Sequence, residues 1–299
     1  MASAGRAEPR CSFEIADKIV TLLRTDEEAR NRWNTLLGRG ISASMRDTFM
    51  AYRNGRRAEY SHKPRVSKYA SACVAKLASV LYGPELNVVY CDTMATEHPD
   101  NQRFFDDVQG WIGRDIQKIT STRYESVDDV FMKRNYMSGP AGAICTVEMK
   151  KRPRFEFQRA TDVHCFGMTA DEGRRIQRFN EGNPELRLRW LLQESGLNKE
   201  DCLEMVRDAG IELPAMYRLG YKNNNCIGCV KATSPAYWNK IRQDFPEVFV
   251  LRAEQSKALG CRLVRVKGER KFLHELAVEN VEVVEEDLSC GPQCGVSAI

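Results

Sequence analysis

The stretch Leu86-Asn87-Val88-Val89-Tyr90-Cys91-Asp92-Thr93 decides the fold that we predict for this chain. Its first six residues are mostly apolar and rich in β-branched and aromatic side chains, which is typical of a strand buried in a sheet. Asp92 and Thr93 follow as a polar pair at the carboxyl end of that strand. Ligands bind at this edge in open α/β sheets, so the pair is a candidate binding site.

Helical patterns lie on both sides of this strand. Apolar residues recur at helical spacing over residues 69–82, and a second helix is expected from about Pro99. Strand and helix patterns then continue to alternate at residues 116–119, 127–133, 162–168 and 171–179. This alternation favours an α/β fold with a mainly parallel sheet and helices on both faces.

The two ends of the chain differ from this central pattern. Residues 1–63 read as a helical N-terminal arm that ends at Lys63-Pro64, and we expect one α/β domain over residues 64–245. A C-terminal extension over residues 246–299 holds a second cysteine pair. Helices are also expected at residues 198–209, 237–242 and 248–259, with a short strand at 262–266.

The composition is that of a soluble globular protein, with 42% apolar residues, 29% charged residues and a net charge of +4. The chain has no run of about 18 apolar residues and no apolar signal-peptide core, so we expect no membrane contact and a cytoplasmic location. Basic residues gather over residues 46–68 and are a candidate contact for nucleic acid. A solvated surface is the alternative.

Eleven cysteines in a chain expected to be cytosolic point to reduced thiols, metal binding or redox chemistry. Cys226 and Cys229 form a Cys-x-x-Cys pair on a polar, Gly-containing turn, which aims two sulfurs at one ion. Zinc and iron–sulfur sites usually need four ligands, and Cys145, Cys290 and Cys294 are candidates for the rest. The alternative is a pair of unliganded thiols. The other six cysteines lie in apolar patterns and are predicted to be packing residues: Cys11, Cys73, Cys91, Cys165, Cys202 and Cys261.

Four stretches over about residues 65–245 together resemble the phosphoadenosine phosphosulfate (PAPS) reductase family. This family belongs to the adenine-nucleotide alpha-hydrolase-like (PP-loop) superfamily, and the stretches stand in the family's order. They are Val88-Val89-Tyr90-Cys91-Asp92-Thr93 with Glu97-His98-Pro99, Cys145-Thr146 with Lys150, Gly167-Met168-Thr169-Ala170-Asp171-Glu172 with Arg174 and Arg175, and Asn225-Cys226-Ile227-Gly228-Cys229.

The resemblance implies a metal centre bound by cysteines. In relatives that reduce adenosine phosphosulfate, one or two cysteines about eighty positions before a Cys-x-x-Cys hold a four-iron cluster. Cys145, Cys226 and Cys229 fall at that spacing, since Cys145 lies 81 positions before Cys226. Cys290 is the candidate fourth metal ligand. We expect an iron–sulfur cluster, with zinc as the alternative.

The resemblance also implies an adenine-nucleotide site with a Ser-Gly-Gly-x-Asp-Ser loop before the helix at 69–82. Glycines in such a loop let the backbone approach phosphate. The chain reads Arg65-Val66-Ser67-Lys68-Tyr69-Ala70-Ser71 there, so only Ser71 matches and the loop is degenerate.

Nucleotide contacts are implied for five residues in all. Besides Ser71 they are Asp92, Thr93, Arg174 and Arg175. The alternative for the first pair is capping of the strand end, and for the two arginines it is ion pairing with nearby carboxylates.

These features predict a PAPS-reductase-like enzyme of sulfonucleotide reduction or adenylation-dependent sulfur chemistry. Cys290 and Cys294 are its candidate nucleophiles, because a thiolate on a C-terminal tail attacks the sulfonucleotide sulfur in such reductases. An adenine nucleotide or sulfonucleotide and a thiol reductant protein are the expected partners. The alternative is a catalytically degenerate metal-binding module of a nucleic-acid-modifying, thiolation-type system.

Overall fold

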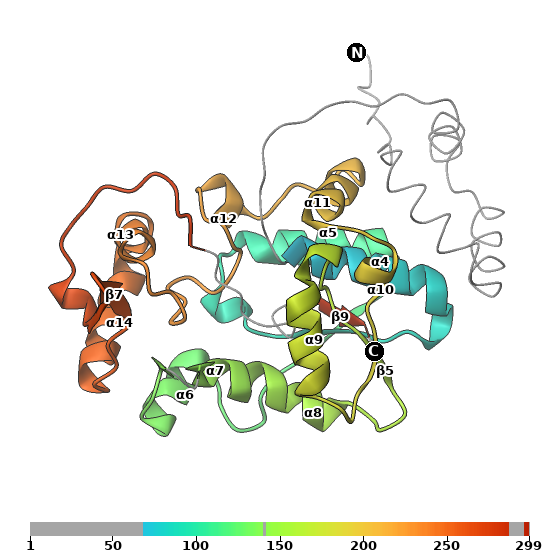
Figure 1. Ribbon diagram of the computed structural model, residues 1–299, viewed down its shortest axis with the longest axis horizontal. Helices are drawn as coiled ribbons and strands as arrows, with labels where there is room; N and C mark the ends of the chain where they lie inside the picture. The colour runs from blue at the N-terminus through green and yellow to red at the C-terminus, as the bar shows by residue number, and fades with distance from the viewer. Residues whose placement is uncertain (1–67, 140–141, 287–295, 299) are drawn as a thin grey trace, which may run out of the picture.

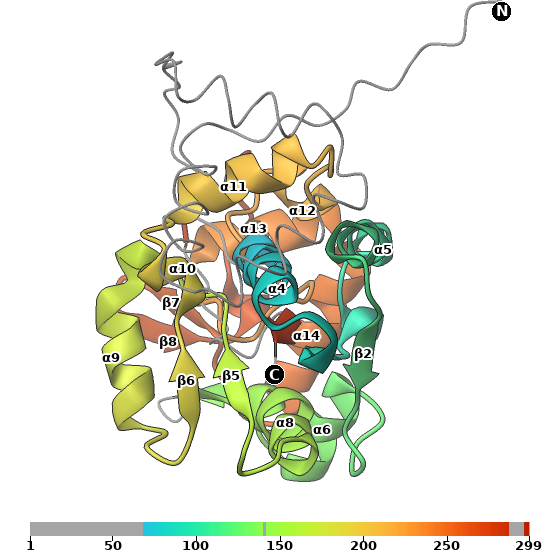
Figure 2. The same ribbon diagram turned by 90° about the vertical axis from the view of Figure 1, so that its right-hand side faces the viewer.

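The computed structural model describes residues 68–139, 142–286 and 296–298. Within them a small sheet lies in the middle, with helices around it (Figures 1 and 2). The predicted arm at 1–63, nearly all of the basic segment 46–68, Cys290 and Cys294 lie outside the described residues. No helix in the described part of the chain is long and apolar enough to cross a lipid bilayer.

The main sheet has the strand order β2-β1-β9-β5-β6. β1 (Val88–Cys91) pairs parallel with β2 (Ile116–Ile119), and β5 (Val163–Cys165) pairs parallel with β6 (Arg187–Arg189). β9 (Val296–Ala298) runs antiparallel between β1 and β5. The predicted mainly parallel sheet is therefore confirmed in part, by the two parallel pairs, while the strand between them is antiparallel. The central position is filled from the C-terminal end of the chain by a strand too short to show a sequence pattern.

One face of the sheet is covered by helix α4 (Lys68–Tyr82), which contacts β9 and β5. Figure 2 shows α4 crossing the sheet, with α11 (Lys199–Asp208) on its outer side. Apolar side chains of α4 are fully buried against β1 and α5 (Asp100–Ile112), which confirms the helix predicted at 69–82. The helix predicted from about Pro99 is confirmed as α5.

A second core lies at the other end of the molecule (Figure 1). α13 (Pro235–Asp244) and α14 (Pro246–Ala258) pack on each other there, with α6 (Val127–Arg134) and the hairpin β7 (Val264–Val266) and β8 (Glu269–Lys271) beside them. Trp238 and Ile241 are fully buried at its centre. The predicted boundary between residues 245 and 246 falls between two helices of this one core.

The described residues also form several further helices, strands and turns. They are β3 (Ser138–Gly139), β4 (Gly142–Ala143), α7 (Ile144–Thr146), a π-helical turn (Val147–Lys151), α8 (Arg152–Phe157), α9 (Gly173–Glu181), α10 (Leu191–Glu194), α12 (Ala215–Arg218) and 3-10 turns at Gly83–Glu85, Met94–Thr96, Ala170–Glu172 and Leu273–Glu275. A small third cluster, formed by Phe166, Met168, Ile176 and Trp190, lies next to β5 and β6. The strand predicted at 162–168 is thus shorter than expected, because its last residues leave the sheet.

Candidate functional site

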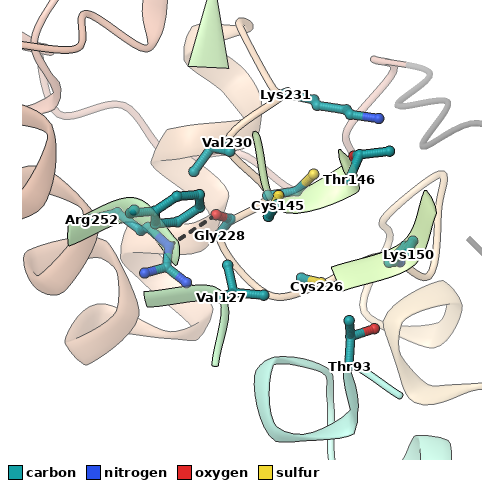
Figure 3. A pocket seen from close by; sticks show the side chains of 12 residues that line it. Thr93, Val127, Cys145, Thr146, Lys150, Cys226, Gly228, Val230, Lys231 and Arg252 are labelled. Atoms are coloured by element: carbon teal, nitrogen blue, oxygen red, sulfur yellow. Dashed lines mark hydrogen bonds between the residues drawn. The ribbon is translucent and has the colours of Figure 1, made fainter. Parts of the chain in front are cut away.

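Three predicted metal ligands, Cys145, Cys226 and Cys229, line one cavity at the carboxyl end of β1 (Figure 3). Cys145 and Cys226 are half-buried and Cys229 is buried. The free volume of the cavity, about 20 Å³, corresponds to one or two water-sized particles. The other lining residues are Thr93, Val127, Phe131, Thr146, Lys150, Gly228, Val230, Lys231 and Arg252. The fold therefore brings the three predicted metal ligands to the lining of one cavity.

The turn at residues 226–229 is held by hydrogen bonds to its backbone. Ile227 N donates to Thr96 O at 2.8 Å, and Cys229 N donates to the hydroxyl of Tyr237 at 2.7 Å. Burial raises the pKa of Tyr237 well above its usual range, so its hydroxyl stays neutral. The turn is thereby attached both to the loop after β1 and to α13.

Gly228 sits at the point of the turn where a side chain would not fit. Its φ is +64°, and a Cβ there would lie 2.8 Å from a methyl group of Val248. Its carbonyl accepts a hydrogen bond from Arg252 Nε at 3.3 Å (Figure 3). Arg252, on α14, is buried, pairs with Asp128 on α6 and lies over the Phe131 ring. It therefore links the turn to both α6 and α14.

Thr96 contacts one of the two sulfurs directly. Its hydroxyl lies 3.2 Å from Cys226 Sγ and 2.9 Å from Thr93 O. The hydroxyl has one proton, so it donates to one of these two acceptors at a time. When it donates to sulfur it favours the thiolate, which is the form that binds metals and acts as a nucleophile.

A buried carboxylate connects β1 to the segment before the cysteine turn. Glu97 accepts hydrogen bonds from Tyr90 at 3.0 Å, Thr93 at 2.9 Å and Asn101 at 2.8 Å. Asn101 Oδ1 in turn accepts from Asn224 Nδ2 at 2.7 Å. Burial, and then the neighbouring Glu97, raises the pKa of Tyr90 well above its usual range, so Tyr90 acts as a neutral donor. The network fixes the end of β1 relative to the cysteine turn.

The polar pair after β1 has local roles in the structure. Asp92 Oδ1 accepts from Met94 N at 2.9 Å and so caps the turn that follows the strand. Thr93 is buried, donates to Glu97 and also lines the cysteine cavity. These contacts match the capping role weighed as the alternative for both residues.

Ser71 lies in the first turn of α4, where the phosphate loop was expected to end. It is buried, and the backbone of Gly167 lies directly against it: a Cβ on Gly167 would be 2.6 Å from Ser71 N. The structure thus places Ser71 beside the stretch that begins at Gly167. Neither residue lines the cysteine cavity.

The two arginines of α9 lie apart from the cysteine cavity. Arg174 is exposed, and Arg175 Nη1 pairs with Glu172 Oε1 at 2.5 Å. Neither lines the cavity, and the ion pair of Arg175 is the role weighed as its alternative.

Three residues that hold the site were not assigned a role from the sequence: Thr96, Tyr237 and Arg252. Lys150 was named there only as part of the stretch that begins at Cys145. Lys150 is buried, lines the cavity and accepts a hydrogen bond from Cys91 Sγ through its carbonyl at 3.4 Å. A charged residue inside the mostly apolar stretch 248–253 was the available signal for Arg252. Thr96 and Tyr237 showed no such signal.

The donor chemistry of the cavity suits a thiophilic metal, since three thiols line it. Thr146, also in its lining, is buried and its hydroxyl has no hydrogen-bond partner. Within the described residues, no three Cys, His, Asp or Glu side chains form a group able to hold a metal ion. The thiols are therefore neighbours around one cavity rather than an assembled ligand set, and Cys290 lies outside the described residues.

No family model, curated protein or solved structure matches the chain. The resemblance to the PAPS reductase family rests on the four motifs. Three of them, the residues after β1, the segment from Cys145 to Lys150 and the turn at residues 226–229, contribute side chains to one cavity.

Proposed function

We propose that this protein is PAPS-reductase-like and performs sulfonucleotide reduction, or adenylation-dependent sulfur chemistry, beside a metal centre bound by cysteines. The observation that carries the proposal is the cavity where Cys145 meets Cys226 and Cys229 at the carboxyl end of β1. The parallel pairs β1/β2 and β5/β6, with α4 across them, support an adenine-nucleotide alpha-hydrolase-like fold. A cytoplasmic location, which keeps thiols reduced, belongs to the same proposal.

The chain's own residues have distinct tasks in this proposal. Cys145, Cys226 and Cys229 hold the centre, with Cys290 as its fourth ligand. An iron–sulfur cluster supplies redox and electrostatic chemistry, whereas zinc, the alternative, supplies a fixed positive charge. Lys150 adds a positive charge at the cavity, which stabilises thiolates and attracts an anionic substrate. The nucleophile is Cys290 or Cys294, regenerated by a thiol reductant protein.

Metal analysis of anaerobically purified protein tests the centre. We expect a brown protein that absorbs near 400 nm, roughly where thiolate–iron charge transfer falls. Cys145→Ser and Cys226→Ser lose the metal, while Cys261→Ser, which removes a buried thiol outside the cavity, retains it. A colourless, zinc-loaded protein selects the alternative metal. Wild-type protein without bound metal contradicts the proposal.

Calorimetry with ATP and PAPS tests the nucleotide half separately. Asp92→Ala removes the side chain that caps the turn after β1, and we expect it to weaken nucleotide binding. Asp115→Ala, an exposed change in the loop before β2, is the control and leaves binding intact. Absence of binding by the wild-type protein removes sulfonucleotide chemistry from the proposal.

The second candidate is a metal-bearing, catalytically degenerate module of a nucleic-acid-modifying system. The burial of Ser71 under the Gly167 backbone favours it, because the first turn of α4 is then closed where a phosphate cradle was expected. This candidate predicts bound metal without nucleotide binding. Its nucleic-acid contact, residues 46–68, predicts affinity for DNA or RNA that falls steeply with salt. Absent or salt-insensitive binding removes that contact.

A further inference from the structure

Arg154, on α8, is buried without a polar partner. Its side chain is 2% exposed, and none of its nitrogens Nε, Nη1 and Nη2 has a hydrogen-bond partner in the described structure. Its contacts are aromatic: the guanidinium lies 4.4 Å from the ring centre of Phe155 and 5.5 Å from that of Phe166. The guanidinium is therefore a buried positive charge whose three nitrogens donate no hydrogen bond to any described residue.

His164, on β5, contacts the same Phe166 ring as Arg154. It is 1% exposed, stacks on Phe166 with ring centres 6.0 Å apart, and its Nδ1 has no hydrogen-bond partner. Burial first, and then the charge of Arg154, lowers the pKa of His164, while Asp162 opposes this shift. The ring is therefore neutral at pH 7, and its Nδ1 is a second buried polar atom, on a residue that contacts Phe166, without a partner among the described residues.

Arg252, a buried arginine of the second core, has the partners that a structural guanidinium usually needs. Arg252 is 3% exposed and pairs with Asp128, Gln255 and the Gly228 carbonyl. Arg154 has none of these partners. Burial lowers its pKa, and Glu185, the carboxylate whose charge opposes that shift, is exposed and forms no hydrogen bond with the guanidinium. An arginine keeps its charge in a protein, and burying a charge without an opposite one is costly. Two aromatic faces compensate for only part of that cost.

Exposed residues flank both members of the pair, and neither member lines the cysteine cavity. Phe155 is 46% exposed and Val163 is 38% exposed, and each is the chain neighbour of one member of the pair. A planar guanidinium presents parallel N–H donors that match the oxygens of a phosphate or sulfate group.

We propose that Arg154 and His164 form a second binding site, which takes a tetrahedral oxyanion of the phosphate or sulfate class. The oxyanion accepts hydrogen bonds from the guanidinium and from His164, and its charge neutralises Arg154. It is either a free inorganic ion or the terminal group of a larger ligand. This site requires neither the metal centre nor the nucleotide site proposed above.

Thermal unfolding and calorimetry of the full-length protein, with sodium phosphate and sodium sulfate as probes, test this site. Sodium chloride at equal ionic strength controls for general salt effects, which do not saturate. We expect a saturable rise in the unfolding temperature of about 5 °C for the wild-type protein. Arg154→Met abolishes the saturable rise, and Arg178→Met, which removes an exposed arginine of α9, retains it.

Three further measurements concern the folding of the Arg154→Met variant, the need for a planar guanidinium, and the source of the anion. Arg154→Met replaces a buried charge with an apolar chain of similar length, so we expect it to fold and to unfold at a higher temperature than wild-type protein without anion. Arg154→Lys retains the charge but loses the planar fork, and weakens phosphate binding at least about tenfold. The affinity for adenosine monophosphate is then compared with the affinity for inorganic phosphate. If adenosine monophosphate binds tenfold tighter, the natural ligand is the phosphate group of a nucleotide. If the two affinities are equal, the natural ligand is the free ion. A wild-type protein without saturable binding, or an Arg154→Met protein that binds as wild type, overturns the proposal.

Discussion

The cysteine turn at residues 226–229 and the first turn of α4 were both expected to contact a ligand. They differ in the contacts that the rest of the chain makes with them. The cysteine turn is held by hydrogen bonds to three places: the loop after β1, α13 and α14. A cavity lies beside it. The first turn of α4 is instead packed against the Gly167 backbone, with Ser71 buried.

This difference shows what a motif needs in order to act as a site. At the cysteine turn, polar groups bind the backbone, so the sulfurs face the cavity. At Ser71, the Gly167 backbone lies so close to the first turn of α4 that a Cβ on Gly167 would clash with it. A matching residue type is therefore weaker evidence than the free space beside it. The following five predictions test the comparison, from the largest expected effect to the smallest.

Gly167→Ala is expected to have the largest effect. Its Cβ would lie 2.6 Å from Ser71 N and 2.7 Å from Ser71 Cα, and backbone atoms inside a helix cannot move aside cheaply. We expect a loss of about 3–4 kcal/mol in the free energy of unfolding by urea. Gly110→Ala, in α5 with no atom within 4 Å, is the control and gains about 0.5–1 kcal/mol. A loss below about 1 kcal/mol for Gly167→Ala would show that α4 is not closed at this point.

Gly228→Ala is expected to cost less, about 2 kcal/mol, because the left-handed backbone is strained and the new Cβ also crowds Val248 Cγ1 at 2.8 Å and Arg252 Cγ at 3.2 Å, which are side-chain atoms and shift more readily than a helix backbone. Gly196→Ala separates these two effects, since Gly196 has a φ of +66° but nothing within 4 Å. We expect it to lose about 1 kcal/mol in the same urea titration. Equal losses for the two variants would mean that the cysteine turn has room for a side chain.

Thr96→Val tests the polar contact with the sulfur. It removes the hydroxyl that lies against Cys226 Sγ, at a cost of about 1 kcal/mol in unfolding free energy. The reaction of Cys226 with iodoacetamide should also slow, because a donor that favours the thiolate is lost. Thr122→Val, an exposed change of the same type, should alter neither quantity. Unchanged labelling of Cys226 in Thr96→Val would remove Thr96 from the site.

Thiol labelling of metal-free protein compares the cavity with the core and requires no mutation. Burial raises the pKa of Cys91 to about 11 and of Cys165 to about 12. At pH 8 only about 0.1% of Cys91 is then thiolate, so mass spectrometry should find Cys145 and Cys226 labelled first. Early labelling of Cys91 or Cys165 would contradict this order.

The same raised pKa values make the free energy of unfolding fall as the pH rises. A folded thiol with a pKa of about 11 retains its proton longer than an unfolded thiol, whose ordinary value is 9.0. Its contribution to stability is therefore complete below about pH 9 and is lost as the pH rises toward 11. Urea unfolding at pH 8 and pH 10 measures this loss.

Much of the secondary structure follows from local sequence. The apolar spacing of residues 69–82 and the run at 86–91 predicted α4 and β1, because helix and strand periods are properties of neighbouring residues. The cysteine spacing likewise identified a set of thiols that line one cavity.

Only the tertiary structure decided which groups meet at the site. Thr96 and Cys226 are 130 positions apart, and Asp128 and Arg252 are 124 positions apart. No local pattern records such contacts, because each depends on the packing of several elements between the partners. The antiparallel β9 and the closure of Gly167 over Ser71 have the same origin. The sequence by itself determined the helices, the strand and the thiols of this protein, and the packing decided which of its predicted sites retains a cavity.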